Sequence, residues 1–413
     1  VYKRQLWWIP GSHASLPVAA VPPRWRKSTA WNKSTSGMLR HSETISDALY
    51  EVKSLMLDVK KTVLASGIPF LYAAAQVTID GKRYYAASSE NPGGKAILID
   101  AETEERFPLP DGPGGVMTFI PVPGESAMLS IEEFYPVFSS ASAKIIKTEL
   151  HRQDGVINAK RSVLAEVPYV HRISLLQEAD GLYLAAGILC RRKTCSDDWS
   201  TPGSLRIGKY EPDARHIEFE TVQDGIFKHH AMQVKPGADG FDELYFGGTE
   251  GCFRTVRQNG QWITERLLDI NTSDIALWDL DGDGQGELAI IEGFHGNNVA
   301  VFKKETGRYV RALDLPASFG HVLWTGSILG GPALIAGSRA ERKELTLYRL
   351  RAVGDKKLSV EQRVELDQGQ APAQIVVLGD GRTLLTTNHD AGELAKYTLS
   401  YKNSPADATK GER

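Results

Sequence analysis

The chain has 413 residues, of which 42% are apolar and 24% charged, so it is long enough to bury a large core. Its 48 basic and 51 acidic side chains nearly cancel, which argues against a protein that binds nucleic acid mainly through charge, and we expect no nucleic-acid partner. No run approaches about 18 uninterrupted apolar residues, so we expect no membrane span and no membrane partner. The three cysteines, Cys190, Cys195 and Cys252, leave one unpaired, which favours a reducing, cytoplasmic location.

The N-terminal segment, residues 1–37, mixes Trp, Pro and basic residues without a helical or strand period. It begins at Val1 and lacks an apolar run followed by a small-residue cleavage site, so it does not resemble a signal peptide. We interpret it as a non-native leader before a start at Met38, with a disordered native extension as the alternative. Residues 44–62 are the one helix candidate, and residues 404–413 are predicted to be a disordered tail.

From about residue 60 onward, short apolar strands alternate with Gly/Asp turns, and one unit recurs. Each unit has an inner strand of small or His-bearing apolar residues, a second strand ending in small residues, a third strand and a more polar fourth strand. The inner strands are predicted at 73–79, 116–122, 170–176, 229–234, 273–280, 321–329 and from 373 onward. Regular short strands of this kind, repeated along a chain, are typical of all-β folds.

The last unit supplies only three strands, and residues 61–67 (KTVLASG) are predicted to provide the fourth. We therefore predict an all-β fold over residues 38–403, a seven-bladed β-propeller closed by an N-terminal strand. Such closure removes the exposed sheet edges that invite aggregation. Two stacked β-sandwiches are the alternative, but they explain the missing C-terminal strand less well.

An acidic loop in the fifth unit spaces carboxylates at its positions 1, 3, 5 and 9. These residues are Asp279, Asp281, Asp283 and Glu287. Alternating oxygens around one centre suit a hard cation such as Ca²⁺, and Gly284 permits the tight turn. The loop resembles that of FG-GAP or VCBS propeller repeats, which implies a calcium ion that braces the blade. A metal-free turn and a catalytic metal are the alternatives.

Histidines recur at equivalent places in the units. At the start of inner strands stand His171, His229 or His230, and His321, and just after second strands stand His295 and His389. Because the inner strands of a propeller line its channel, these side chains are predicted to converge at one axial funnel. Several imidazoles there suit a divalent metal such as Zn²⁺ or Mn²⁺, or a general base. The alternative is that each ring only bonds backbone at the mouth of the channel.

Four segments resemble, in the same order, the propeller domain of the fungal aldos-2-ulose dehydratase (1,5-anhydro-D-fructose dehydratase) family. They are VHRISLL, FKHHAMQVKPGADGFDELYFGGTEG, GFHGNNVAVFKK and the acidic loop, within roughly residues 110–350. The chain stops where the family carries cupin-like domains, and Thr118 stands where the family carries a channel histidine. The resemblance implies a metal-assisted hydro-lyase that removes water from a keto-sugar such as 1,5-anhydro-D-fructose, with this small sugar as its partner.

The resemblance also implies roles for individual residues. His171 would be the general base, and Arg172 would hold a sugar hydroxyl or the enolate, because its guanidinium stays protonated. A metal held by histidines would polarise the ketone, and the candidate ligands are His229, His230, His295 and His321. Neighbouring side chains of a strand point to opposite faces, so only one of His229 and His230 is expected at the site, and the family match favours His229.

Further residues are candidates for contact with the substrate. Asp274, Tyr135 and Asp390 near the rim are possible proton donors, and Trp199 lies in a polar insertion, 191–204, where it would suit a sugar face. Trp278 and Trp324, inside inner strands, are expected to pack between blades.

Three functions remain open at this stage: the lyase, a non-catalytic FG-GAP-like propeller that binds glycan or protein, and a polysaccharide lyase with a His-bound metal. The two lyases predict a deep polar pocket in the channel, and the binding module predicts a flat rim.

Overall fold

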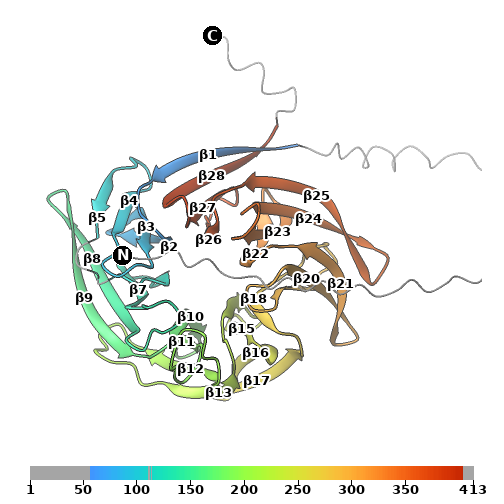
Figure 1. The fold of residues 1–413 in the computed structure, drawn as a ribbon, viewed down its shortest axis with the longest axis horizontal. Helices are drawn as coiled ribbons and strands as arrows, with labels where there is room; N and C mark the ends of the chain where they lie inside the picture. The colour runs from blue at the N-terminus through green and yellow to red at the C-terminus, as the bar shows by residue number, and fades with distance from the viewer. Residues whose placement is uncertain (1–55, 110–111, 113, 403–413) are drawn as a thin grey trace, which may run out of the picture. The chain divides into compact units, whose positions relative to one another are not determined.

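The computed structural model describes residues 56–109, 112 and 114–402. Within these ranges the chain forms 28 β-strands and no helix, so no helix there is long and apolar enough to cross a membrane. The strands form seven antiparallel sheets of four strands each, arranged as blades around a central axis (Figure 1). This topology confirms the predicted seven-bladed β-propeller. The leader, the tail and residues 44–55 of the helix candidate lie outside the described residues.

The blades follow one another along the chain. Blade 1 comprises β2 (Leu71–Ile79), β3 (Lys82–Ser89), β4 (Ala96–Asp100) and β5 (Arg106–Pro108), and blade 2 comprises β6 (Thr118–Pro121), β7 (Ala127–Glu132), β8 (Lys144–Gln153) and β9 (Val156–Glu166). Blade 3 comprises β10 (Val170–Glu178), β11 (Gly181–Ile188), β12 (Gly203–Tyr210) and β13 (Glu220–Ile226). Blade 4 comprises β14 (Ala231–Pro236), β15 (Asp242–Gly248), β16 (Gly251–Gln258) and β17 (Gln261–Leu268).

The remaining three blades keep the same strand order. Blade 5 comprises β18 (Thr272–Trp278), β19 (Glu287–Glu292), β20 (Asn298–Glu305) and β21 (Arg308–Pro316), and blade 6 comprises β22 (Gly320–Ile328), β23 (Gly331–Ser338), β24 (Leu345–Val353) and β25 (Lys357–Asp367). Blade 7 comprises β26 (Pro372–Val377), β27 (Thr383–Asn388), β28 (Glu393–Tyr401) and β1 (Leu57–Ala65).

The N-terminal strand closes the ring, as predicted. β1 pairs antiparallel with β28, from Leu57 opposite Tyr401 to Ala65 opposite Leu394, and the two strands lie side by side in Figure 1. The closing strand therefore begins earlier than the predicted residues 61–67. The helix predicted over 44–62 is wrong for residues 57–62, because the open edge of β28 offers these residues a complete ladder of backbone partners.

The apolar core is divided among the spaces between neighbouring blades. One cluster joins Leu129 of blade 2 to Leu184 of blade 3, and another joins Tyr245 of blade 4 to Ile290 of blade 5. Each sheet is therefore buried on both faces, which explains the nearly continuous apolar runs of the second strands. Packing between blades leaves the axis of the ring to the inner strands.

Inner strands repeat one irregularity where they enter the channel. In β10, Val170 pairs with Ile188 and Arg172 with Gly187, so His171 is an extra residue in the ladder. The same skip occurs in four further inner strands, at Tyr72, Ser273, His321 and Ala373. A bulge of this kind re-aims the side chain of the extra residue. The bulged positions therefore form a ring of side chains at one end of the channel.

Candidate functional site

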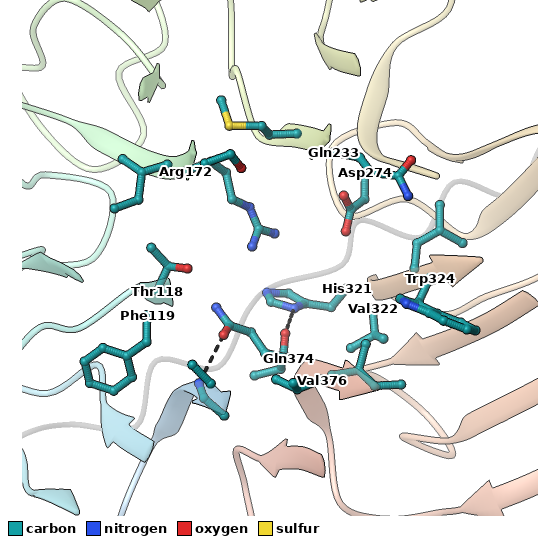
Figure 2. Close-up of a pocket in the computed structure, with 18 of the residues that line it drawn as sticks. Thr118, Phe119, Arg172, Gln233, Asp274, His321, Val322, Trp324, Gln374 and Val376 are labelled. Carbon is teal, nitrogen blue, oxygen red and sulfur yellow. Dashed lines mark hydrogen bonds between the residues drawn. The ribbon is translucent and has the colours of Figure 1, made fainter. Parts of the chain in front are cut away.

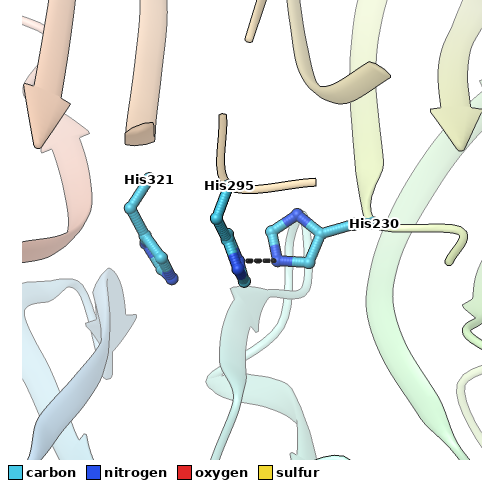
Figure 3. Close-up of side chains that lie close together, drawn as sticks. All are labelled: His230, His295 and His321. Atoms are coloured by element: carbon cyan, nitrogen blue, oxygen red, sulfur yellow. Dashed lines mark hydrogen bonds between the residues drawn. The ribbon is translucent and has the colours of Figure 1, made fainter. Parts of the chain in front are cut away.

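Three histidines from different parts of the chain meet at the start of the inner strands (Figure 3). His230 directly precedes β14, His295 lies in the loop between β19 and β20, and His321 is the bulged residue of β22. One ring nitrogen from each lies within 4.8 Å of the others. The Nε2 atoms of His230 and His295 are 3.3 Å apart, and all three side chains are buried. The predicted convergence of histidines thus occurs for this trio.

Backbone carbonyls fix the orientation of two of these rings. Nδ1 of His230 lies 2.7 Å from the carbonyl oxygen of Ser273, and Nδ1 of His321 lies 2.9 Å from that of Ala373. Because a carbonyl only accepts hydrogen bonds, each Nδ1 carries the proton and each Nε2 keeps its lone pair. Metal-binding histidines usually have such a partner on the other ring nitrogen.

The trio could hold a metal ion, and the spacing of two of its rings suits one. Two nitrogens bound tetrahedrally at about 2.1 Å lie roughly 3.4 Å from each other, close to the spacing of His230 and His295. His321 differs, because its Nε2 accepts hydrogen bonds from the Tyr72 hydroxyl at 3.2 Å and from Arg339 Nη1 at 3.4 Å. To bind a metal, His321 would have to release these donors. Tyr72 and Arg339 were not predicted, since nothing in their local sequence distinguishes them.

His230, and not His229, belongs to this cluster. Nδ1 of His229 lies 3.0 Å from the carbonyl oxygen of Ser204, and its ring lies 5.4 Å from that of Phe246, in the space between blades. Burial lowers the pKa of His229 to about 4, so the ring is neutral at pH 7. The structure therefore places His230, and not the preferred His229, with His295 and His321. His230 takes the place that the bulged residues hold in other blades, because its N–H and the neighbouring Ala231 both face Gly247.

His171 lies beside the cluster. Its ring centroid is 4.4 Å from that of His230 and 5.2 Å from that of Phe134, and its buried Nδ1 has no hydrogen-bond partner. Burial, followed by the charge of Arg172, holds the pKa of His171 well below its usual value. The ring is therefore neutral at pH 7 but a weak base, and its role as general base stays a prediction.

Aromatic side chains cover the histidines on the side of the rim. His295 lies 4.3 Å from Phe294 and 4.5 Å from Phe319, ring centre to ring centre. Trp199 packs on Phe294 at 5.4 Å, and Lys193 Nζ lies 3.2 Å from the centre of the Trp199 ring. Together with Phe138 these rings form an aromatic cap, defined as Phe138, Trp199, Phe294 and Phe319. Trp199 is thus part of the cap and does not line the cavity in the central channel, and its contact with a sugar stays a prediction.

A cavity of about 390 Å³ occupies the central channel next to His321 (Figure 2). Residues from all seven inner strands line it, and its polar members include Gln76, Thr118, Arg172, Gln233, Asp274, His321 and Gln374. Arg172 donates from Nε to the carbonyl oxygen of His230 at 3.1 Å, and its guanidinium points into the cavity. Trp324 also lines the cavity, so it does more than pack between blades. Gln233 and Gln374 brace the wall, since Leu277 N and Ala74 N donate to their amide oxygens.

Of the three predicted proton donors, Asp274 lines the cavity. Burial raises its pKa to about 6, although the charge of Arg172 acts in the opposite direction. Asp390 instead pairs with Lys343 and lies 3.0 Å from His389 Nδ1, while Tyr135 packs against the backbone of Gly115. The structure therefore places Asp274 with Arg172 and His321, and places Tyr135 and Asp390 elsewhere.

The acidic loop lies between the first two strands of blade 5, as predicted, but a lysine reaches into it. Nζ of Lys303, from β20, forms an ion pair with Asp281 and lies 2.9 Å from Asp283 and 3.6 Å from Glu287. Asp279 accepts from the backbone N–H groups at 282 and 284, and Glu287 accepts from that at 280. Asp279, Asp281 and Asp283 each offer an oxygen within 4.8 Å of the others and could hold a metal ion. The buried ammonium of Lys303 now neutralises these carboxylates, and a calcium ion here stays a prediction.

Lys303→Met is expected to destabilise the protein by about 3–5 kcal/mol, the usual cost of removing one partner of a buried ion pair. It leaves Asp281 and Glu287, both fully buried, without a counter-charge. The melting temperature of the variant should rise on addition of Ca²⁺, and that of the wild type should be unchanged by Ca²⁺ or by a chelator. The exposed neighbour Lys304→Met serves as the control. A wild-type melting temperature that rises with Ca²⁺ would restore the calcium interpretation.

Comparison with known proteins by sequence found no match: no family model and no curated protein matches the chain. Among solved structures, the holo form of the pyranose dehydrogenase PQQ domain from Coprinopsis cinerea is similar, with 9% identity and a TM-score of 0.46. The match covers 83% of this chain and 97% of that chain. The propeller assignment rests on the sheet topology of this chain itself. The resemblances to aldos-2-ulose dehydratases and to FG-GAP or VCBS repeats stay predictions.

Proposed function

We propose that the protein is a metal-assisted lyase that eliminates water, or another β-leaving group, from a small keto-sugar held in the central channel. The proposal is carried by the cluster of three histidines together with the polar cavity beside it, which is lined by His321, Arg172 and Asp274. The cavity volume of about 390 Å³ is in the usual range for small-molecule sites, roughly 300–1,000 Å³. The sequence resemblance described above supports a substrate such as 1,5-anhydro-D-fructose.

Elimination of water from a keto-sugar has three requirements. A base takes the proton from the carbon next to the ketone, the developing enolate is stabilised, and the departing hydroxyl on the next carbon receives a proton. The C–H electron pair becomes the new C=C bond, so the products are an enone and water. A divalent metal held by His230, His295 and His321 would polarise the ketone as a Lewis acid.

Residues of the chain supply the other parts of this chemistry. Arg172 directs its guanidinium into the cavity, where it can donate to the enolate oxygen or to a ring hydroxyl. Asp274 has a raised pKa of about 6, so both its acid and its carboxylate are available near neutral pH, which suits proton transfer to the leaving hydroxyl. The base remains the one that the resemblance implies, His171. The polar cavity in the channel favours this function over a non-catalytic propeller, for which a flat rim is predicted.

The test uses protein stripped of metal and then reloaded with Zn²⁺ or Mn²⁺. With 1,5-anhydro-D-fructose, the loaded wild type is expected to produce the enone, followed by its ultraviolet absorbance, and the stripped protein is not. Asp274→Asn should keep its metal and lower kcat by roughly 10²–10⁴, the usual contribution of general acid catalysis. Because the acid form is required, the wild-type rate should fall as the pH rises above about 6.

Asp355→Asn, at an exposed turn, is the matched control and should be fully active. Absence of enone from the metal-loaded wild type, with 1,5-anhydro-D-fructose and with other keto-sugars, would refute the lyase. Full activity of Asp274→Asn would instead remove only the role of this carboxyl.

A further inference from the structure

Two guanidinium groups lie at His321 and its cavity without a carboxylate partner. Arg339, from the loop after β23, places Nη1 3.4 Å from His321 Nε2, and Arg172 reaches into the cavity from β10. Both side chains are partly buried. Among the residues that the structure describes, neither arginine forms an ion pair. Some other partly buried arginines pair with a carboxylate, as Arg161 does with Glu132 and Arg254 with Glu243.

The surroundings do not neutralise these charges. Lys228 adds a third cation near His295, with Nζ 5.1 Å from the ring centre of Phe294. The nearby carboxylate of Glu90 lies 2.8 Å from Nε2 of His389, so it already has a partner. Asp274 is the acidic residue among those that line the cavity. Three cationic side chains, those of Arg172, Arg339 and Lys228, thus lie around the histidines and the cavity, against the carboxyl of Asp274.

An unpaired charge costs free energy to the extent that it is buried, and two partly buried guanidinium groups lie here: Arg172 lines the cavity and Arg339 lies at His321, which lines it. The planar fork of a guanidinium matches a carboxylate, to which it can donate two parallel hydrogen bonds. A metal cation on the neighbouring histidines would also be repelled by the arginines unless an anion bound with it.

We infer that the channel site takes an anionic sugar derivative, a keto-sugar acid or a uronate, whose carboxylate is paired by Arg172 and Arg339. This inference rests on the proposed function for the location of the site, and it narrows the substrate from keto-sugars in general to those that carry an acid group. Neutral sugars of the same size are expected to be poor ligands.

The test compares ligands that differ in the acid group: 2-keto-D-gluconate against D-fructose, and D-glucuronate against D-glucose. Binding is measured by calorimetry with metal-loaded protein and needs no turnover. Each acid is expected to bind at least about 10-fold more tightly than its neutral partner, since a hydrogen bond to a charged group contributes about 1.5–3 kcal/mol. Arg339→Gln and Arg172→Gln should each reduce this preference, and the exposed Arg351→Gln should not.

Equal affinity of acid and neutral sugars, or no measurable binding of either acid, would overturn the inference. So would a preference for acids that persists in both glutamine variants of the site. These results are separate from those for the lyase. Acid-selective binding without any elimination would support the anion site and refute the lyase. Elimination from a neutral sugar, with equal affinity for acid and neutral sugars, would support the lyase and refute the anion site. The comparison of ligands on the wild type stands even where a variant fails to fold.

Discussion

His230→Ala is expected to lose the bound divalent metal and to lower the rate of elimination by roughly 10²–10³. A metal that polarises a carbonyl contributes several kcal/mol, and each 1.36 kcal/mol is a factor of ten in rate. His230 is central to the trio, because its Nδ1–H donates to Ser273 and its Nε2 faces His295 at 3.3 Å. Metal content after dialysis and enone formation are measured on the same sample.

His229→Ala is the matched control, since it removes the adjacent histidine. Its ring donates to Ser204 between blades, so the variant should lose stability and keep both metal and activity per folded molecule. His295→Ala should behave like His230→Ala, and His171→Ala should keep its metal. Loss of metal from His229→Ala and not from His230→Ala would reverse the assignment of these two residues. Loss from His171→Ala would add a fourth ligand and leave the base unidentified.

The second large effect is expected with pH: the free energy of unfolding should fall steeply as the pH drops from about 6.5 towards 4. Burial lowers the pKa of His229 to about 4 and that of His295 to about 3, and holds those of His171, His230 and His321 well below the usual value. In this window the unfolded chain binds protons that the folded chain excludes, so acid favours unfolding. Each such histidine costs about 1.4 kcal/mol per pH unit.

Some carboxyl groups act in the opposite direction. Burial raises the pKa of Glu178 and Glu287 to about 7 and that of Asp274 to about 6, so these groups favour the folded state as the pH falls to about 4. The histidines outnumber them, and the net effect should be loss of stability.

Thermal melting between pH 8 and 4.5, with metal removed, measures the balance of these groups. His229→Gln should reduce the slope of stability against pH by the contribution of about one histidine. Replacement of the exposed His151, in His151→Gln, should leave this slope unchanged. A melting temperature that is constant or rises down to pH 5 would show that the buried rings are already protonated in the folded protein.

Much of the architecture follows from local sequence. Short strands with alternating or continuous apolar residues, separated by Gly/Asp turns, predict the blades, and the strand missing from the last unit predicts closure by N-terminal residues. The acidic loop is also placed correctly between β18 and β19. These features depend on side-chain periodicity and turn chemistry, which a few neighbouring residues determine.

The identity of the site residues depends on the tertiary structure. Strand alternation alone predicts that one of His229 and His230 faces the channel, without saying which. The irregular start of the inner strands places His230 there. Lys303 enters the acidic loop because β20 pairs with β19, and Arg339 reaches His321 from the loop that follows β23. The sequence by itself thus determined the propeller and placed histidines at the start of its inner strands. Which of them meet, and which charges surround them, was decided by ladder register and by contacts between blades, because these set the direction of each side chain over long sequence separations.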